Sequence, residues 1–251
     1  MTAITDCPER REWQALGRAL PRPKAVLVVS AHWETMGRTH VTAGDAPRTI
    51  HDFRGFPPEL HAVQYPAPGA PWLVERIAAL LGEDRIKRDD SWGFDHGAWG
   101  VVMPMFPDAD IPLVAMSLDR SLDGDGHLAL GAKLAPLRDE GVLIIGSGNI
   151  IHNLQLWWKG QDAFLPWAPQ FAHRIFDAIR TSDHPALTRF APDDEAAALA
   201  INSGEHYLPL LYTVGARLPG DEVGFFNDTH ESALAMTSVL IGDTALIETA
   251  A

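Results

Sequence analysis

Three histidines of this chain follow apolar segments or open helical ones, where side chains that do chemistry often stand. His32 comes after the apolar run 25–29, His152 follows "VLIIGSGNI", and His206 lies in "GEHYLP". If the strands are parallel, their carboxyl ends share one edge of a sheet, so residues distant in sequence converge there. Converging neutral imidazoles suit Zn, Fe or Cu. The alternative is three unrelated histidines in polar loops, and spacing alone leaves both interpretations open.

Two further histidines stand in segments with unusual composition. His96 lies in "SWGFDHGAWG", where glycines and the tryptophans Trp92 and Trp99 indicate close backbone approach and an aromatic wall. A buried aromatic cluster with a satisfied histidine is the alternative there. His51 precedes Asp52 in "IHDFRGFP", where the alternative is a hydrogen bond within the loop. We assign surface or structural roles to the histidines without converging partners, which are His40, His61, His127, His173 and His184.

The elements that must position these residues alternate along the chain between strand and helix patterns. We predict strands over 25–30, 111–118, 141–148 and 234–242. Helices are predicted over 8–20, 73–81, 130–137, 171–179, 192–200 and 205–216. This alternation is typical of an α/β fold with a mostly parallel central sheet flanked by helices. His32 would then lie two residues past the end of its strand, and the Pro- and Gly-rich segment 44–70 would be a long, functional loop.

Composition narrows the class of protein and its partners. The 251 residues suit one α/β domain, and 46% of them are hydrophobic. The net charge of −13 argues against nucleic acid or an anionic membrane as a partner, since both attract basic surfaces. No apolar run approaches the roughly 18 residues of a membrane span. The single cysteine and an amino-terminal segment unlike a signal peptide lead us to expect a cytoplasmic protein.

Several blocks of the chain resemble those of one enzyme family, in the same order. They are "VVSAHWET", "IHDFRGFPPEL", "YPAPG", "WGFDHGAWGVVMPMFPDADIPLVAMSLD", "GSGNIIHNL" and "EHYLPLLYTVGA". The chain is similar to the class III extradiol ring-cleavage dioxygenases, and most similar to their 4,5-DOPA dioxygenase branch. The resemblance runs from about Trp13 to the last predicted strand. It implies an α/β fold and an oxidoreductase that opens catechol rings beside the diol with O2 on one divalent non-haem metal, Fe(II) or Zn(II).

The resemblance also implies roles for individual residues. His32 and His206 match family metal ligands, and His152 matches the histidine that acts as acid and base or as a further ligand. His96 matches the histidine near dioxygen and substrate. For the substrate ring we expect contacts from four residues, which are His51, Trp33, Trp92 and Trp99.

The resemblance fails at one place. Family members normally begin with a strand ending in a "HGSP"-like turn whose histidine is the first metal ligand, and this sequence starts after that point. We therefore expect one catalytic domain over 1–251 without that strand, explained either by codons for it further upstream or by divergence. Such a site would depend on two histidines, with His152 available as a third ligand.

Three functions agree with these observations. The first is a metal-dependent extradiol dioxygenase acting on a small catechol-type substrate and O2 in aromatic compound metabolism. The second is a zinc-dependent hydrolase in which the metal and His152 activate water. The third is a non-catalytic, Memo-like binding protein on the same scaffold. The particular catechol, the choice between iron and zinc, and the oligomeric state stay open at this point.

Overall fold

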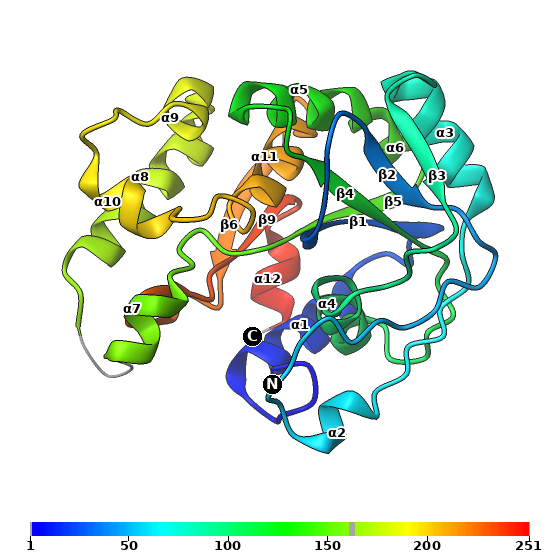
Figure 1. The fold of residues 1–251 in the computed structure, drawn as a ribbon, viewed down its shortest axis with the longest axis horizontal. Coiled ribbons are helices and arrows are strands. Elements are labelled where there is room, and N and C mark those ends of the chain that lie inside the picture. Colours follow the sequence, from blue (N-terminus) through cyan, green and yellow to red (C-terminus); the bar gives the residue numbers. More distant parts are fainter. Residues whose placement is uncertain (1, 161–163, 251) are drawn as a thin grey trace.

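The computed structural model describes residues 2–160 and 164–250, which fold around a five-stranded sheet (Figure 1). The strand order is β3-β2-β4-β1-β5. β1 (Ala25–Thr35) pairs in parallel with both β4 (Leu113–Asp119) and β5 (Val142–Ser147). β2 (Thr39–Thr42) joins β4 antiparallel and β3 (Ile86–Asp89) parallel. The prediction of an α/β fold with a mostly parallel central sheet is confirmed.

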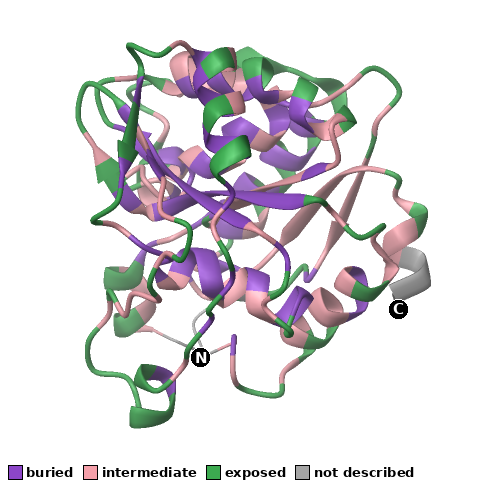
Figure 2. Cartoon of the chain, turned by 90° about the vertical axis from the view of Figure 1, so that its right-hand side faces the viewer, coloured by how far each residue is buried: buried purple, intermediate pink, exposed green. Residues whose placement is uncertain are grey.

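The apolar start of β1 is explained by burial on both faces of the sheet. Leu27 and Val29 belong to one hydrophobic cluster, and Val26 and Val28 belong to another. Successive side chains of a strand point to opposite faces, so an unbroken apolar run supplies both clusters. Figure 2 shows the central strands buried along their length, between helices above and below them.

The helices that cover the sheet divide between its two faces (Figure 1). One face carries α3 (Pro71–Leu81), α5 (Gly124–Leu134) and α11 (Leu208–Gly215). The other face carries α1 (Pro8–Ala19) and α4 (His96–Met105), and α12 (Ala245–Ala250) packs against α1. Two candidate histidines therefore approach one sheet edge from opposite layers, His96 from the start of α4 and His206 from just before α11.

A third hydrophobic cluster lies beside the sheet. It joins α8 (Trp167–Thr181) to α9 (His184–Thr188), α10 (Glu195–Ala200) and the hairpin of β6 (Glu222–Phe226) and β9 (Ser238–Gly242). The remaining elements are short, namely α2 (Pro58–His61), α6 (Pro136–Asp139), α7 (Leu154–Lys159), β7 (His230–Glu231) and β8 (Leu234–Ala235). Among the residues described, none of the helices combines the length and the apolar character needed to cross a bilayer.

Most predicted elements are present, but several boundaries were wrong. The strand predicted over 25–30 continues to Thr35, so His32 lies inside β1 and not past its end. The helix predicted over 205–216 begins only at Leu208, because Pro209 favours the first turn of a helix and leaves His206 in the preceding turn. The other differences are the helix 130–137, interrupted before Pro136, and the strand 234–242, split into β8 and β9.

Three elements near the site were not predicted. β2 and β3 have four residues each, which is too short for an alternating pattern to stand out. α4 was missed because two glycines and a proline within it disguise the helical pattern. The segment 44–70 is irregular as expected, apart from the single turn of α2.

Candidate functional site

His32 is placed by an interruption in the pairing of β1. Val29 lies opposite Met116 and Glu34 opposite Leu118, so five steps along β1 match two along β4, a surplus of three residues. A bulge of this kind bends a strand and re-aims its side chains. His32 lies within the surplus residues, with 27% of its side chain exposed. The buried run therefore anchors the strand, and the bulge turns the imidazole toward the sheet edge.

The start of α4 is held tightly against this bulge. Asp95 caps the helix, and its buried carboxylate also accepts a hydrogen bond of 2.7 Å from Ser30 Oγ in β1. Gly97 permits the approach, because a Cβ there would lie 2.5 Å from Ser30 Oγ and 3.0 Å from His32 Cδ2. His96, the first residue of α4, is thereby brought beside His32, with 3.9 Å between their ring centroids.

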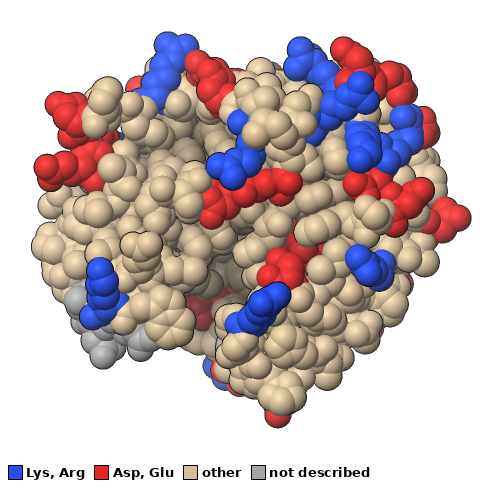
Figure 3. All heavy atoms as spheres, in the orientation of Figure 1, with Lys and Arg blue, Asp and Glu red and all other residues tan. Residues whose placement is uncertain are grey.

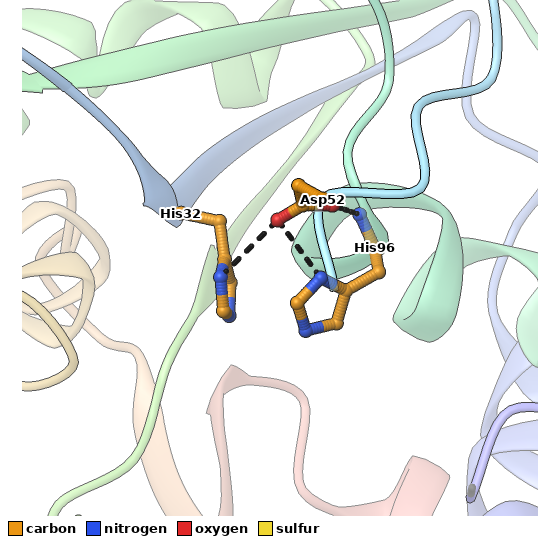
Figure 4. A group of neighbouring side chains, drawn as sticks. All are labelled: His32, Asp52 and His96. Atoms are coloured by element: carbon orange, nitrogen blue, oxygen red, sulfur yellow. Dashed lines mark hydrogen bonds and ion pairs between the residues drawn. The ribbon is translucent and has the colours of Figure 1, made fainter. Parts of the chain in front are cut away.

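Asp52, from the irregular segment, joins the two histidines (Figure 4). Its Oδ2 lies 2.9 Å from His96 Nδ1 and 3.3 Å from His32 Nδ1. Its Oδ1 accepts a hydrogen bond of 2.8 Å from the backbone N–H of His96. One carboxylate is thus in contact with the backbone N–H of His96 and with one ring nitrogen of each histidine.

The other two histidines continue the row of rings from His32. The ring centroid of His206 lies 5.1 Å from that of His32. His152 stacks on His206 at 3.4 Å, with 7° between the ring planes. The order of the rings is therefore His96, His32, His206, His152. The sequence analysis expected His32, His152 and His206 to converge, and the structure brings them together with the further candidate His96.

Asn149 orients His206 through both its backbone and its side chain. Its backbone N–H donates to the His206 carbonyl at 2.8 Å, and its Oδ1 lies 3.2 Å from His206 Nδ1. Its Nδ2 donates to the Ala235 carbonyl at 2.8 Å, which sets the amide so that the oxygen faces the imidazole. The close approach needs Gly148, because a Cβ there would collide with the His206 carbonyl oxygen.

The electrostatics of the first pair balance burial against a carboxylate. Burial lowers the pKa of His32 to about 4, the neighbouring His96 adds to this, and Asp52 opposes it. For Asp52, burial disfavours the charged form, but the hydrogen bonds from His96 outweigh it and hold the pKa of the carboxyl below its usual value. At neutral pH, His32 is therefore a neutral imidazole and Asp52 an ionised carboxylate.

The second pair is also kept neutral. Burial lowers the pKa of His206 to about 2, and the neighbouring histidines, His152 first, act in the same direction. Burial likewise lowers the pKa of His152, with the Glu205 carboxylate opposing the shift. Neutral imidazoles keep a lone pair, which a metal ligand or a general base requires.

The donor set fits a divalent metal ion. Two groups of side chains have ligand atoms within 4.8 Å of one another, His32 with Asp52 and His96, and His152 with Glu205 and His206. The groups meet at His32 and His206, so nitrogen donors lie inside the row and carboxylates at its flanks. Buried neutral imidazoles suit Fe(II) or Zn(II).

The residues expected around the substrate are placed less directly. Trp99 is 1% exposed and donates from Nε1 to the Ile50 carbonyl, while Trp33 is 4% exposed and stacks on Trp92. With so little surface, Trp33 and Trp99 would act mainly by supporting the site, and their contact with substrate stays a prediction. His51 lies outside the row, since its Nε2 lies 2.9 Å from the Val63 carbonyl oxygen.

Three polar residues of the site were not singled out from the sequence. Asp52 was treated as a loop residue, and Asn149 and Glu205 were passed over although each lies within three residues of a candidate histidine. An acceptor next to a histidine in a strand-end segment is a usable signal, because buried imidazoles need partners for both nitrogens.

Figure 3 shows the surface of the molecule in the orientation of Figure 1. This surface is hollowed near its centre, beside the end of β1, with acidic and basic side chains around the opening.

Comparisons with known proteins agree with this geometry. The model of the catalytic LigB subunit of aromatic ring-opening dioxygenase matches residues 9–238. The 4,5-DOPA dioxygenase extradiol of Escherichia coli (strain K12) is 46% identical over 222 residues, covering 86% of this chain and 81% of that protein. The protein of that name from Beta vulgaris is 42% identical over 198 residues, 78% of this chain and 74% of its own. The crystal structure of an uncharacterized Escherichia coli K12 protein superimposes with a TM-score of 0.81 and 40% identity, over 95% of this chain and 94% of that one.

Proposed function

The chain belongs to the LigB family of aromatic ring-opening dioxygenases, as an extradiol dioxygenase, and from this premise we propose that it opens a catechol ring on one divalent metal held by His32 and His206. The observation that carries the proposal is the row of four histidine rings, His96, His32, His206 and His152, at one edge of the sheet. Both atoms of O2 enter the product, and the bond that breaks lies next to the diol.

The metal would be held from the middle of the row. His32 comes from β1 and His206 from the turn before α11, and His152, stacked on His206, is the candidate for a third ligand. When bound, the metal would lower the pKa of the catechol hydroxyls and bring the diol and O2 together. We propose Fe(II) as the working ion, because Zn(II) has no redox chemistry, and Zn(II) as a competitor for the same nitrogen donors.

The two outer histidines would handle protons. His152 is neutral, and a ring nitrogen of it can accept the proton of a catechol hydroxyl. His96 Nδ1 lies 2.9 Å from Asp52 Oδ2, and its Nε2 faces away from that carboxylate, where it would be free to accept a proton (Figure 4). In this arrangement His152 would act as the base on the substrate, and His96 would handle a proton on the dioxygen side.

We propose a catechol with an amino-acid side chain as the substrate, as the names of the relatives suggest. The rim beside His32 carries both signs of charge, since Glu34 pairs with Arg120 at 3.3 Å. Burial raises the pKa of Glu34, and the Glu205 carboxylate, close enough to act on it, raises it further. A rim with a guanidinium and two carboxyl groups suits the carboxylate and the ammonium of a zwitterion.

The experiment is a metal and oxygen exchange. Protein stripped of metal is loaded with Fe(II) or Zn(II) and mixed with DOPA under air or without oxygen, while oxygen uptake and the absorbance of the ring-opened product are followed. We expect turnover only with Fe(II) under air. No oxygen uptake and no ring-opened product from the Fe(II)-loaded protein under air would contradict the proposed ring cleavage. Dopamine and dihydroxyphenylpropionate, which each lack one charge of DOPA, then test the rim, and equal KM values for all three would contradict the proposed substrate.

A further inference from the structure

Asp52 has an unusual number of histidine contacts for a loop carboxylate. Its two oxygens face three donors, namely His96 N–H, His96 Nδ1 and His32 Nδ1 (Figure 4). The side chain is only 14% exposed, so water competes little for these positions. The His32 and His96 rings both contact this carboxylate, with 3.9 Å between their centroids and 52° between their planes.

The contacts specify which nitrogen of each ring carries the proton. An ionised carboxylate only accepts hydrogen bonds, so a neutral imidazole that faces it must carry its proton on Nδ1. The lone pair of each ring is then on Nε2, the atom on the far side from Asp52. His32 and His96 would therefore each point an Nε2 lone pair to the side away from Asp52, His32 as a metal ligand and His96 as a base.

We propose that Asp52 is a positioning residue shared by His32 and His96, and not a metal ligand. Its two oxygens already face a backbone N–H and two ring nitrogens, so a metal ion on Asp52 would compete with these contacts. As a positioning residue it fixes the tautomer and the angle of both rings at once. It also joins the irregular segment 44–70 to the site. The ligand role of His32 in this inference rests on the proposed function.

The direct test is the tautomer of the histidines in the metal-free chain, observed by the ¹⁵N chemical shifts of the imidazoles. We expect Nδ1–H for both His32 and His96 in the unmodified protein. This measurement requires neither a mutant that folds nor an active enzyme, so its outcome is independent of the proposed function. A predominant Nε2–H form of His32 or of His96 would overturn the inference.

The second test is the variant Asp52→Asn, which keeps the shape but replaces one acceptor oxygen with a donor. If the new amide nitrogen replaces Oδ2, both imidazoles must turn a lone pair on Nδ1 toward it and carry their protons on Nε2. If it replaces Oδ1, it faces the backbone N–H of His96, which is itself a donor. Partners of ligating histidines typically contribute about 10- to 100-fold in metal affinity, so we expect a loss in that range by competition with a chelator. An unchanged Fe(II) or Zn(II) affinity would refute the role of Asp52.

Two controls separate positioning from ligation and from general damage. The first control is Asp89→Asn, which breaks a similar Asp–His contact outside the row, since Asp89 Oδ2 lies 3.0 Å from His40 Nδ1. This variant should leave the metal affinity unchanged. In a His32→Ala background, Asp52→Asn should cost much less affinity than in the unmodified chain, because Asp52 acts on the metal through that ring. An equal loss in both backgrounds would mean that Asp52 is itself a ligand.

Discussion

The histidine row consists of two halves that differ in what stands behind the rings. The carboxylate-backed half consists of His32, His96 and Asp52. The amide-backed half consists of His206, His152 and Asn149. In the first half one carboxylate serves two rings side by side. In the second half one neutral amide serves a single ring, and the other ring stacks on it.

The difference shows how the partner of a buried imidazole sets its charge. Both His32 and His206 are desolvated, but Asp52 offsets part of the effect, so burial lowers the pKa of His32 only to about 4 and that of His206 to about 2. Asn149 cannot offset burial, because its amide carries no charge. Asp52 thus places a negative charge against both rings of the first half. In the second half the Glu205 carboxylate opposes the pKa shift of His152, whereas His206 faces a neutral amide and stays neutral over a wider pH range.

The largest effect should come from removing one ring of each half. We expect the double variant His32→Ala, His206→Ala to lose bound Fe(II) or Zn(II), because the two inner nitrogen donors are gone. Metal content after dialysis against a defined free-metal concentration, measured by atomic emission, is the readout. Each single variant should retain measurable but weaker binding. Full occupancy in the double variant would show that the metal is not held between the halves.

The next effect separates the two rings of the amide-backed half. His152→Ala should keep most of the metal and lose about 100- to 10,000-fold in the rate of ring cleavage, as is typical when a general base is removed. Metal content and the turnover of DOPA by the Fe(II)-loaded variant are measured together. Release of the metal from this variant would show that His152 is a ligand, and the metal would then have three protein ligands, His32, His206 and His152.

The pH dependence of stability should distinguish the halves in the metal-free protein. An unfolded histidine binds its proton near pH 6.5, so a folded one with a lower pKa loses about 1.4 kcal/mol of stability per pH unit below that value. For His32 this loss ends near pH 4, whereas for His206 it continues toward pH 2. Urea unfolding with chelator at pH 7, 5 and 3.5 should therefore show a shallower decline for His206→Gln than for the unmodified chain. Parallel curves for the two proteins would contradict the buried, neutral state of His206.

The smallest effect concerns the amide itself. Asn149→Ala should weaken metal binding by about tenfold, at the lower end for partners of ligating histidines, because a neutral partner of one ring is lost. Asn153→Ala is the matched control, since its Nδ2 donates to the Leu199 carbonyl and its Oδ1 accepts from the Leu156 N–H at the start of α7, instead of facing one of the four rings. A loss of affinity as large in the control would attribute the effect to the local fold.

Much of the framework could be predicted because it depends on local patterns. The unbroken apolar residues 25–29 and the helical spacing of Leu73, Ile77 and Leu81 report burial directly, since each element must cover its own apolar side. The short strand β2 and the glycine-rich α4 could not be predicted, because their pairing and packing partners compensate for weak local preference. The sequence blocks around the candidate histidines could be recognised for the same reason as the strands, because each block is a continuous stretch of sequence.

The sequence alone was sufficient for the layered α/β architecture and for naming His32, His96, His152 and His206 as candidates. The folded chain was needed to show that Asp52, from an irregular loop, reaches two of them, and that Asn149 faces a third. Strand and helix patterns are periodic and therefore local, whereas a hydrogen bond between distant segments depends on a bulge in β1 and on glycines that let backbones touch. The proton positions proposed for His32 and His96 rest on those contacts and therefore on the tertiary structure.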